Sequence, residues 1–223
     1  MLEESALFGS LEPSVRHAVA GAMREVQFEA GQMIFARDDQ GSEIFLLVQG
    51  RVRISVMKST GRELSFAHVL PGEVFGEIAA LDGLCRSAEA IALTESTLML
   101  LPGRSLQNLL DTNPPFARAA IRFLCARLRK ASDHLEDIAL LPIEGRLARY
   151  LLDELSHGEP AGQTGTRRMV LGISQSELAL LLGAARSKVS AALVSLEHAG
   201  AIERKGRDLH CNPALLAEIA QRE

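Results

Sequence analysis

The chain has 223 residues, enough for one large domain or two small ones, and its 47% hydrophobic and 23% charged residues are ordinary for a globular protein. No apolar run approaches the roughly 20 residues that span a bilayer, and no secretory signal pattern opens the chain. We therefore expect a cytoplasmic protein without membrane contacts. Three widely spaced cysteines exclude a C-x-x-C zinc or redox pair, and a four-cysteine iron–sulfur site within one chain.

The net charge of −4 taken over the whole chain argues against nucleic acid binding, but the charges are unevenly distributed along the sequence. Residues 1–140 hold 14 basic and 18 acidic side chains, whereas residues 141–223 hold 10 of each. Because the whole acidic excess is N-terminal, the C-terminal third can still present a basic face to DNA.

Helical spacing of apolar residues predicts a first helix over residues 10–23. From Val26 to about Pro102 the pattern changes to short apolar segments separated by glycines, which predicts a small antiparallel sandwich or jelly roll. Within it, apolar and polar residues alternate over residues 51–56, which predicts a strand with one solvent-facing side. The glycines taken as turn signals are Gly31, Gly41, Gly61, Gly72 and Gly83.

A long helix is predicted from about residue 113 to about residue 141. Its apolar residues recur in steps of 4 and 3, a heptad pattern typical of a helix that pairs with a copy of itself. The alternative is a helix lying on the β domain, and both hold if different faces are used. The residues of this seam are Ala117, Ile121, Leu124, Leu128, Ala131, Leu135 and Ile138.

The segment after Pro142 contains the pattern of a helix-turn-helix. Ser174 and Glu177 form a capping box that opens one helix. A small residue at 179, a glycine at 183 and valine at 189 follow the spacing of two helices that cross closely around a left-handed turn. A second helix is predicted over residues 185–198, and the stretch after it reads as a hairpin turning at residues 205–206. Together these elements predict a winged helix-turn-helix.

The second helix of this motif would enter the major groove by its N-terminal turn. Arg186 can donate to O6 and N7 of guanine, and the start of the preceding helix suits phosphate binding. The DNA-binding candidates are Ser174, Gln175, Ser176, Arg186, Ser187, Lys188 and Ser190. Wing residues Arg204, Lys205 and Arg207 would add phosphate contacts. The alternative is a winged helix used for protein contacts.

A second motif, FGEIAALDGLCRSA, occupies residues 75–88. Gly76 lets the backbone approach a ligand closely, and the helical turn after it exposes N–H groups. Arg86 offers a fork for two phosphate oxygens, while Glu77 can accept from a sugar hydroxyl. The alternative is that Glu77 and Arg86 pair with each other across the turn.

This stretch resembles the phosphate-binding cassette of cyclic-nucleotide-binding domains, F-G-E-[IL]-A-L-L followed by P-R-S-A. From about residue 5 to its end, the chain resembles the bacterial cAMP receptor protein and FNR family of transcription regulators in domain order and length. The resemblance implies that Glu77 holds the ribose 2′-hydroxyl and that Arg86 pairs with the cyclic phosphate. The assisting residues it implies are Gly76, Ile78 and Ser87, with Arg127 bracing Glu77 and Ser132 reaching the base from the partner subunit.

Departures from the family pattern affect the ligand and the DNA site. Cys85 stands where proline is usual, and its neighbour Arg86 can favour a thiolate there. Ala131 replaces the threonine of a Thr-Ser pair that meets adenine, so cGMP or another nucleotide remains an alternative to cAMP. The recognition helix has Ala191 where a second arginine is common and lacks the usual glutamate after Arg186, so its operator should differ from the best-known one.

We therefore expect an α+β fold with a β-roll at residues 1–112, a dimerisation helix at 113–141 and a winged helix-turn-helix domain at 142–223. The expected protein is a homodimeric regulator, not an enzyme, that binds a cyclic nucleotide and a palindromic double-stranded DNA site. No metal, haem or iron–sulfur cluster is expected. The resemblance also implies contact with RNA polymerase, for which the loop at 156–166 is a candidate.

Two other functions stay open on sequence grounds. One is a regulator of the same family with a vestigial pocket that acts without ligand. The other is a cupin-like metalloenzyme, since the jelly roll is shared. The enzyme would need clustered metal ligands, and His68 is the one histidine among the predicted strands.

Overall fold

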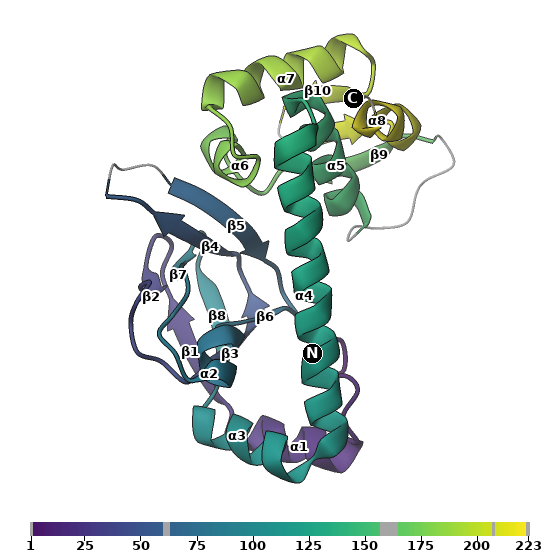
Figure 1. The fold of residues 1–223 in the computed structure, drawn as a ribbon. Coiled ribbons are helices and arrows are strands. Elements are labelled where there is room, and N and C mark those ends of the chain that lie inside the picture. Colours follow the sequence, from purple (N-terminus) through teal and green to yellow (C-terminus); the bar gives the residue numbers. More distant parts are fainter. Residues whose placement is uncertain (1, 60–62, 157–164, 207, 222–223) are drawn as a thin grey trace. The chain divides into compact units, whose positions relative to one another are not determined.

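The computed structural model describes residues 2–59, 63–156, 165–206 and 208–221 (Figure 1). The chain divides into two compact units, Met1–Lys130 and Ala131–Glu223, so that the long helix α4 (Pro114–Leu140) contributes to both. The fold class is α+β, as expected. This division after Lys130 differs from the predicted domain boundaries after residues 112 and 141, which remain predictions. Gly61, Arg207 and most of the 156–166 loop lie outside the described residues.

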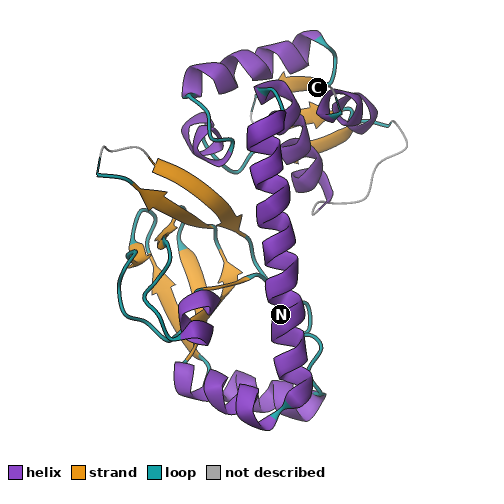
Figure 2. Ribbon diagram, viewed as in Figure 1, coloured by secondary structure: helices purple, strands orange, loops and turns teal. Residues whose placement is uncertain are grey.

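The first unit contains two antiparallel four-stranded sheets, with strand orders β1-β8-β3-β6 and β2-β7-β4-β5 (Figures 1 and 2). Side chains from both sheets meet in one core, which includes Leu47, Val52, Phe75 and Leu98. The predicted sandwich is therefore confirmed. The strands are β1 Arg24–Phe28, β2 Met33–Phe35, β3 Ile44–Gln49, β4 Val52–Met57, β5 Glu63–Val69, β6 Val74–Phe75, β7 Glu89–Ala92 and β8 Ser96–Leu101.

The predicted solvent-facing side of β4 is wrong. Ser55 is fully buried, and the register between β4 and β5 shifts between Ile54 and Ser55. The extra residue of this shift is Phe66 of β5, because Ile54 pairs with Ala67 and Ser55 with Ser65, so β4 itself keeps its alternation. Its polar face is covered by neighbouring strands: Ser55 Oγ donates to Glu89 at 2.9 Å, and the Arg53 side chain, 12% exposed, pairs with Glu63. Because this cover comes from other strands, the alternation within β4 alone could not reveal it.

Helices close one side of the first unit. They are α1 Pro13–Ala22, α2 Glu77–Asp82, α3 Gly103–Thr112 and the first turns of α4. Their apolar side chains form a second core with β3, in which Phe8 stacks on Phe116 with ring centroids 6.1 Å apart. Phe116, Ala119 and Ala120 of α4 are buried, so one face of this helix does pack in the first unit. Helix α1 begins later than predicted, because proline occupies its first position, and α3 was not predicted.

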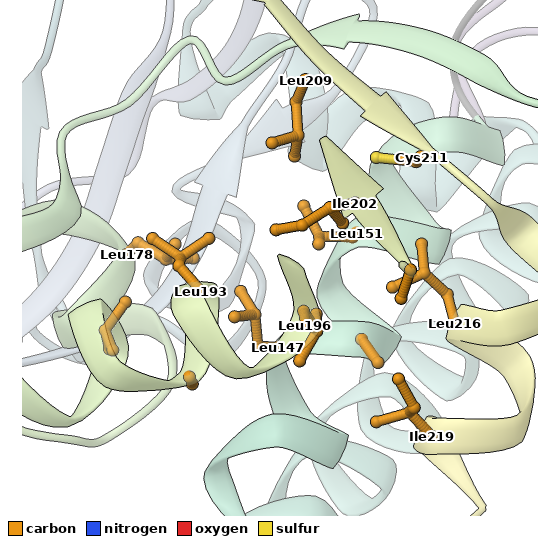
Figure 3. Close-up of a cluster of buried hydrophobic side chains, with 14 of the residues drawn as sticks. Leu147, Leu151, Leu178, Leu193, Leu196, Ile202, Leu209, Cys211, Leu216 and Ile219 are labelled. Atoms are coloured by element: carbon orange, nitrogen blue, oxygen red, sulfur yellow. The ribbon is translucent and has the colours of Figure 1, made fainter. Parts of the chain in front are cut away.

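The second unit contains a helix-turn-helix and a small three-stranded sheet of order β10-β11-β9. Its core brings Leu147 and Leu151 of α5 together with Leu193 and Leu196 of α7 (Figure 3). The helix pair and the hairpin are as predicted, whereas β9 and α8 were missed. The elements are α5 Ile143–Ser156, β9 Arg167–Val170, α6 Gln175–Leu181, α7 Arg186–His198, β10 Ile202–Lys205, β11 Asp208–Cys211 and α8 Pro213–Ala220.

Among the described helices, none is by itself long and apolar enough to cross a bilayer. Helices α6 and α7 reach that length and apolar composition only together, and they are bent by 99° at the break between them.

Candidate ligand pocket and nucleic-acid interface

A pocket lies in the first unit where β6 ends and α2 begins. Gly76 caps α2 with a left-handed backbone, φ 79°, which glycine adopts without steric cost. The pocket encloses about 400 Å³ of empty space, including its open mouth. It is lined by Phe35, Ile54, Phe75, Gly76, Glu77, Ile78, Ala79, Arg86, Ser87, Ala88 and Arg127. The structure thus brings together six of the seven predicted ligand-binding residues.

Arg86 is a buried cation, only 3% exposed. Its Nη1 donates to the carbonyl oxygens of Glu43 at 3.0 Å and Gly76 at 2.8 Å, and its Nη2 donates to Glu43 Oε2 at 3.2 Å. The guanidinium carbon lies 4.3 Å from the ring centre of Phe35, a favourable cation–π distance. The ion pair of Arg86 is therefore made with Glu43, which sequence analysis did not identify, and not with Glu77.

Burial lowers the pKa of Arg86 from its usual value, while the Glu43, Asp39 and Glu77 carboxylates act in the opposite direction. Arginine nevertheless keeps its charge in proteins. Its Nε is buried and has no hydrogen-bond partner in the described structure. An unpaired donor on a buried cation is costly. These features fit a site for an anionic group.

Two glycines make room for this guanidinium. A Cβ added at Gly41 would lie 2.5 Å from Arg86 Nε, and one at Gly76 would lie 2.9 Å from Nη1. Both distances are too short for atoms that are not bonded. The loop before β3 and the start of α2 therefore approach Arg86 closely because these two positions have no side chain.

Glu77 is the buried anion of the pocket, 4% exposed. Its Oε1 lies 4.0 Å from Nε of Arg127, and the Arg127 guanidinium also donates to the carbonyl of Val74. Arg127 comes from α4 and stacks over Phe123, one turn earlier, at 5.2 Å. The arrangement places Arg127 where it was expected to brace Glu77, and that role stays a prediction.

The remaining ligand candidates differ in position. Ile78 and Ser87 are exposed on the pocket wall, and Cys85 is an exposed free thiol beside them. Ser132 is on the part of α4 that belongs to the second unit, so its approach to a base from a partner stays a prediction. Among the described residues, no three His, Cys, Asp or Glu side chains gather as a metal site.

The predicted helix-turn-helix geometry is confirmed in the second unit. Ser174 Oγ accepts from the N–H of Glu177 at 3.2 Å, and Gly183 has φ 60°. The turn is also held from α5, because Arg146 Nη1 donates to the carbonyl of Leu182 at 2.7 Å. The sequence thus sets both the start of α6 and the corner between α6 and α7.

The predicted DNA-binding side chains are accessible to different extents. Ser174, Ser176, Arg186, Ser187 and Lys188 are exposed, and Gln175 and Ser190 are half-buried. The opposite face of α7, with Val189 and Leu193, is in the core.

Sequence analysis missed Val194, an exposed hydrophobic side chain on α7. It follows Ser190 by four positions and Ser187 by seven, a spacing that places all three on one helix face. That spacing was the signal that could have found it. An apolar side chain on this face suits contact with a thymine methyl group.

Two cations of the wing, Arg204 and Lys205, are paired with carboxylates. Arg204 donates from Nε to both carboxylate oxygens of Glu197 at 3.1 Å, and Lys205 lies 3.0 Å from Glu203. The bond to Arg204 lowers the pKa of Glu197 and raises that of Arg204. Arg204 and Lys205 are two of the three wing residues predicted to contact phosphate. Each would therefore have to break an ion pair with a carboxylate before it could bind DNA.

The predicted dimerisation seam is exposed along most of α4. Ile121, Leu124, Leu128, Ala131 and Leu135 are exposed in the protomer, and Ile138 is half-buried. The first three belong to the first unit and the others to the second. The face used for packing within the first unit is different, so the two sequence interpretations of this helix are compatible.

Two family models match the chain, a cyclic nucleotide-binding domain over residues 25–113 and a Crp-like helix-turn-helix domain over residues 145–219. Their order agrees with the pocket and the helix pair described above. The cyclic AMP receptor protein of Thermus thermophilus is 30% identical over 221 residues, covering 98% of each chain. The chain belongs to the CRP/FNR family of transcription regulators.

Other CRP/FNR-type proteins agree with this assignment. A CRP-like cAMP-activated global transcriptional regulator of Mycobacterium tuberculosis is 28% identical over 209 residues, 94% of this chain and 93% of the relative. The solved structure of FixK2 from Bradyrhizobium japonicum has a TM-score of 0.81 at 25% identity, covering 90% of this chain and 98% of FixK2. The chain is thus a DNA-binding regulator with a cyclic-nucleotide-binding domain, and the cupin-like enzyme alternative is wrong.

Proposed function

We propose that this CRP/FNR regulator is a cytoplasmic homodimer that binds a cyclic nucleotide in the first unit and a palindromic DNA site through α7. Cyclic AMP is the first candidate effector, and cGMP is the second. The observation that carries the proposal is that one pocket holds both a buried anion, Glu77, and a buried cation, Arg86, whose Nε has no hydrogen-bond partner among the described residues. A ligand with one anionic group and a neighbouring hydroxyl complements both.

In this proposal each pocket residue binds a different part of the ligand. Arg86 binds the cyclic phosphate with Ser87 and the N–H groups at the start of α2, at Gly76 and Ile78. Glu77 accepts from the ribose hydroxyl and is oriented by Arg127. The partner's copy of Ser132 contacts the base.

Arg127 links the pocket to the rest of the molecule in this proposal, because it is on α4. The same helix continues into the second unit and carries the proposed dimer seam. A ligand shifts such an equilibrium only by the difference in its affinity for the two states. The two α7 helices of a dimer, about 34 Å apart, would contact half-sites one DNA turn apart. The dimer bound to this DNA would then contact RNA polymerase.

A second candidate is a regulator of the same family that works without ligand. It is favoured by the Glu43 carboxylate, which already neutralises Arg86 in the structure. In that case the pocket would be closed by its own ion pair, and DNA affinity would not respond to any nucleotide.

Calorimetric titration with cAMP and with cGMP separates these candidates. We expect binding of at least one nucleotide to the wild type, loss of binding in Arg86→Ala, and no change in Arg122→Ala, which alters an exposed arginine of α4 outside the pocket. Denaturation curves check that Arg86→Ala folds, and Ser87→Ala serves as a milder pocket variant. DNA binding measured with and without nucleotide completes the test. No nucleotide binding together with unchanged DNA affinity would favour the ligand-independent regulator.

A further inference from the structure

The Glu43 carboxylate is bound to Arg86, the cation that a ligand phosphate would bind. Glu43 lies directly before β3, its carboxylate is 3.2 Å from Arg86 Nη2, and its side chain is 41% exposed. The other two acceptors of Arg86 are main-chain carbonyls, those of Glu43 itself and of Gly76. The Glu43 carboxylate is therefore the one acceptor among these three that can leave by a side-chain rotation alone.

The charges around Arg86 are unfavourable to a further anion. Three carboxylates act on Arg86, those of Glu43, Asp39 and Glu77, against the two cations Arg86 and Arg127. The group has a net charge of −1 before any ligand enters. A phosphodiester brings a second negative charge into a site where Arg86 is 3% exposed, so solvent screens the repulsion poorly.

Each of the other two carboxylates has a structural role. Glu77 is buried against Arg127. Asp39 Oδ2 accepts from the N–H of Ala36 at 2.9 Å, and the carbonyl of Asp39 accepts from the N–H of Arg86 at 2.8 Å. Moving the Asp39 carboxylate would disturb the loop whose main chain holds Arg86, and moving the Glu77 carboxylate would break its contact with Arg127. Glu43 can turn toward water without that disturbance.

We propose that Glu43 competes with the anionic group of the ligand for Arg86, so that ligand binding requires the Glu43 carboxylate to leave. This inference rests on the proposed function. It makes Glu43 a residue that sets the affinity of the pocket, because every binding event includes breaking the Glu43–Arg86 ion pair. The pair also protects the buried cation when ligand is absent.

Glu43→Gln tests the competition directly, because glutamine keeps the length of the side chain and one oxygen acceptor but has no charge. Arg86 stays held by its two carbonyl acceptors and by Phe35. Asp38→Asn is the matched control: it removes one negative charge from the same loop, where the Asp38 side chain is 84% exposed. Asparagine also tolerates the positive φ of 67° at this position.

The expected result is a dissociation constant for cAMP or cGMP that falls roughly fivefold to tenfold in Glu43→Gln, since one charge repulsion is removed. Asp38→Asn should stay within about twofold of the wild type, because an exposed charge contributes little. Equal affinity of wild type and Glu43→Gln would overturn the competition while leaving the proposed function intact.

If neither nucleotide binds any variant, the proposed function fails, and inorganic phosphate becomes the probe of Arg86. The increase in thermal midpoint with phosphate concentration is compared among wild type, Glu43→Gln and Asp38→Asn. A larger increase in Glu43→Gln alone supports the competition. An equal increase in all three overturns it.

Discussion

The Nε atom of Arg127 lies 4.0 Å from Oε1 of Glu77, and it joins a helix to a carboxylate that is almost fully buried. A buried carboxylate that loses its cation is strongly destabilised. We predict that Arg127→Ala lowers the free energy of unfolding by about 1–3 kcal/mol and weakens nucleotide binding about tenfold or more. Urea denaturation and calorimetry measure the two effects. Arg122→Ala, on an exposed face of α4, should change neither.

Gly76→Ala should destabilise the first unit by two separate effects. Alanine is strained at φ 79°, and its Cβ would lie 2.9 Å from Arg86 Nη1. Backbone strain of this kind costs about 1–3 kcal/mol. Gly72→Ala is the matched control, because Gly72 has φ 90° but no atom within 4 Å of the added Cβ. If both variants lose the same free energy of unfolding, the close approach of Arg86 contributes nothing.

The α4 seam predicts a specific effect on oligomeric state. Leu135→Glu places a charge on a seam position that is 68% exposed in the protomer, and burying that charge against a copy would be unfavourable. We expect the variant to be monomeric by light scattering at concentrations where the wild type is dimeric. Leu140→Glu is matched in exposure, at 70%, but lies off the seam. A dimer that persists in Leu135→Glu would place the interface elsewhere.

Salt dependence of DNA binding should distinguish an exposed cation, Lys188, from a paired one, Arg204. Lys188 is exposed at the start of α7, so Lys188→Ala should reduce the slope of log affinity against log salt by about 0.9 if this residue neutralises one phosphate. Arg204→Ala should leave the slope nearly unchanged, because its guanidinium is held by Glu197. A slope that falls equally in both variants would mean that the Arg204–Glu197 pair breaks on DNA.

Acid should weaken the fold through His68. Burial, together with the charges of Arg51 and Arg53, lowers the pKa of His68 to about 3. Between pH 6.5 and about 3, the unfolded chain takes up a proton at this site that the folded chain does not, so stability falls as pH falls. The contribution is at most about 1.4 kcal/mol per pH unit. Denaturation curves between pH 7 and pH 4 should show a steeper loss for wild type than for His68→Gln, and parallel losses would contradict the prediction.

Local signals in the sequence predicted the sandwich and the helix-turn-helix. Turn glycines such as Gly72 and the capping pair of Ser174 with Glu177 act within a few residues, so their spacing is readable without the fold. The sequence prediction lacks helix α3 although Leu106, Leu109 and Leu110 have helical spacing, because the prolines at 114–115 indicate a helical region that begins only there.

Other features depend on contacts distant in sequence. Glu43 meets Arg86 across 43 residues, and nothing in the FGEIAALDGLCRSA motif points to it. Ser55 is buried where its Oγ donates to Glu89, 34 residues away. The bonds of Arg204 to Glu197 join a strand to the helix before it, and basic residues in a wing sequence do not reveal such a partner. The types of residue in the pocket were therefore predictable, but their pairing was not.

The bond from Arg146 to the carbonyl of Leu182 has a mechanical consequence. It fastens the corner between α6 and α7 to α5, while Leu147, Leu151, Leu193 and Leu196 fill the space between α5 and α7. Helices α5, α6 and α7 should therefore move as one rigid body. A small rotation of α5 would change the direction of Arg186 and Ser187 together, without any change in how the exposed side chains of α7 pack.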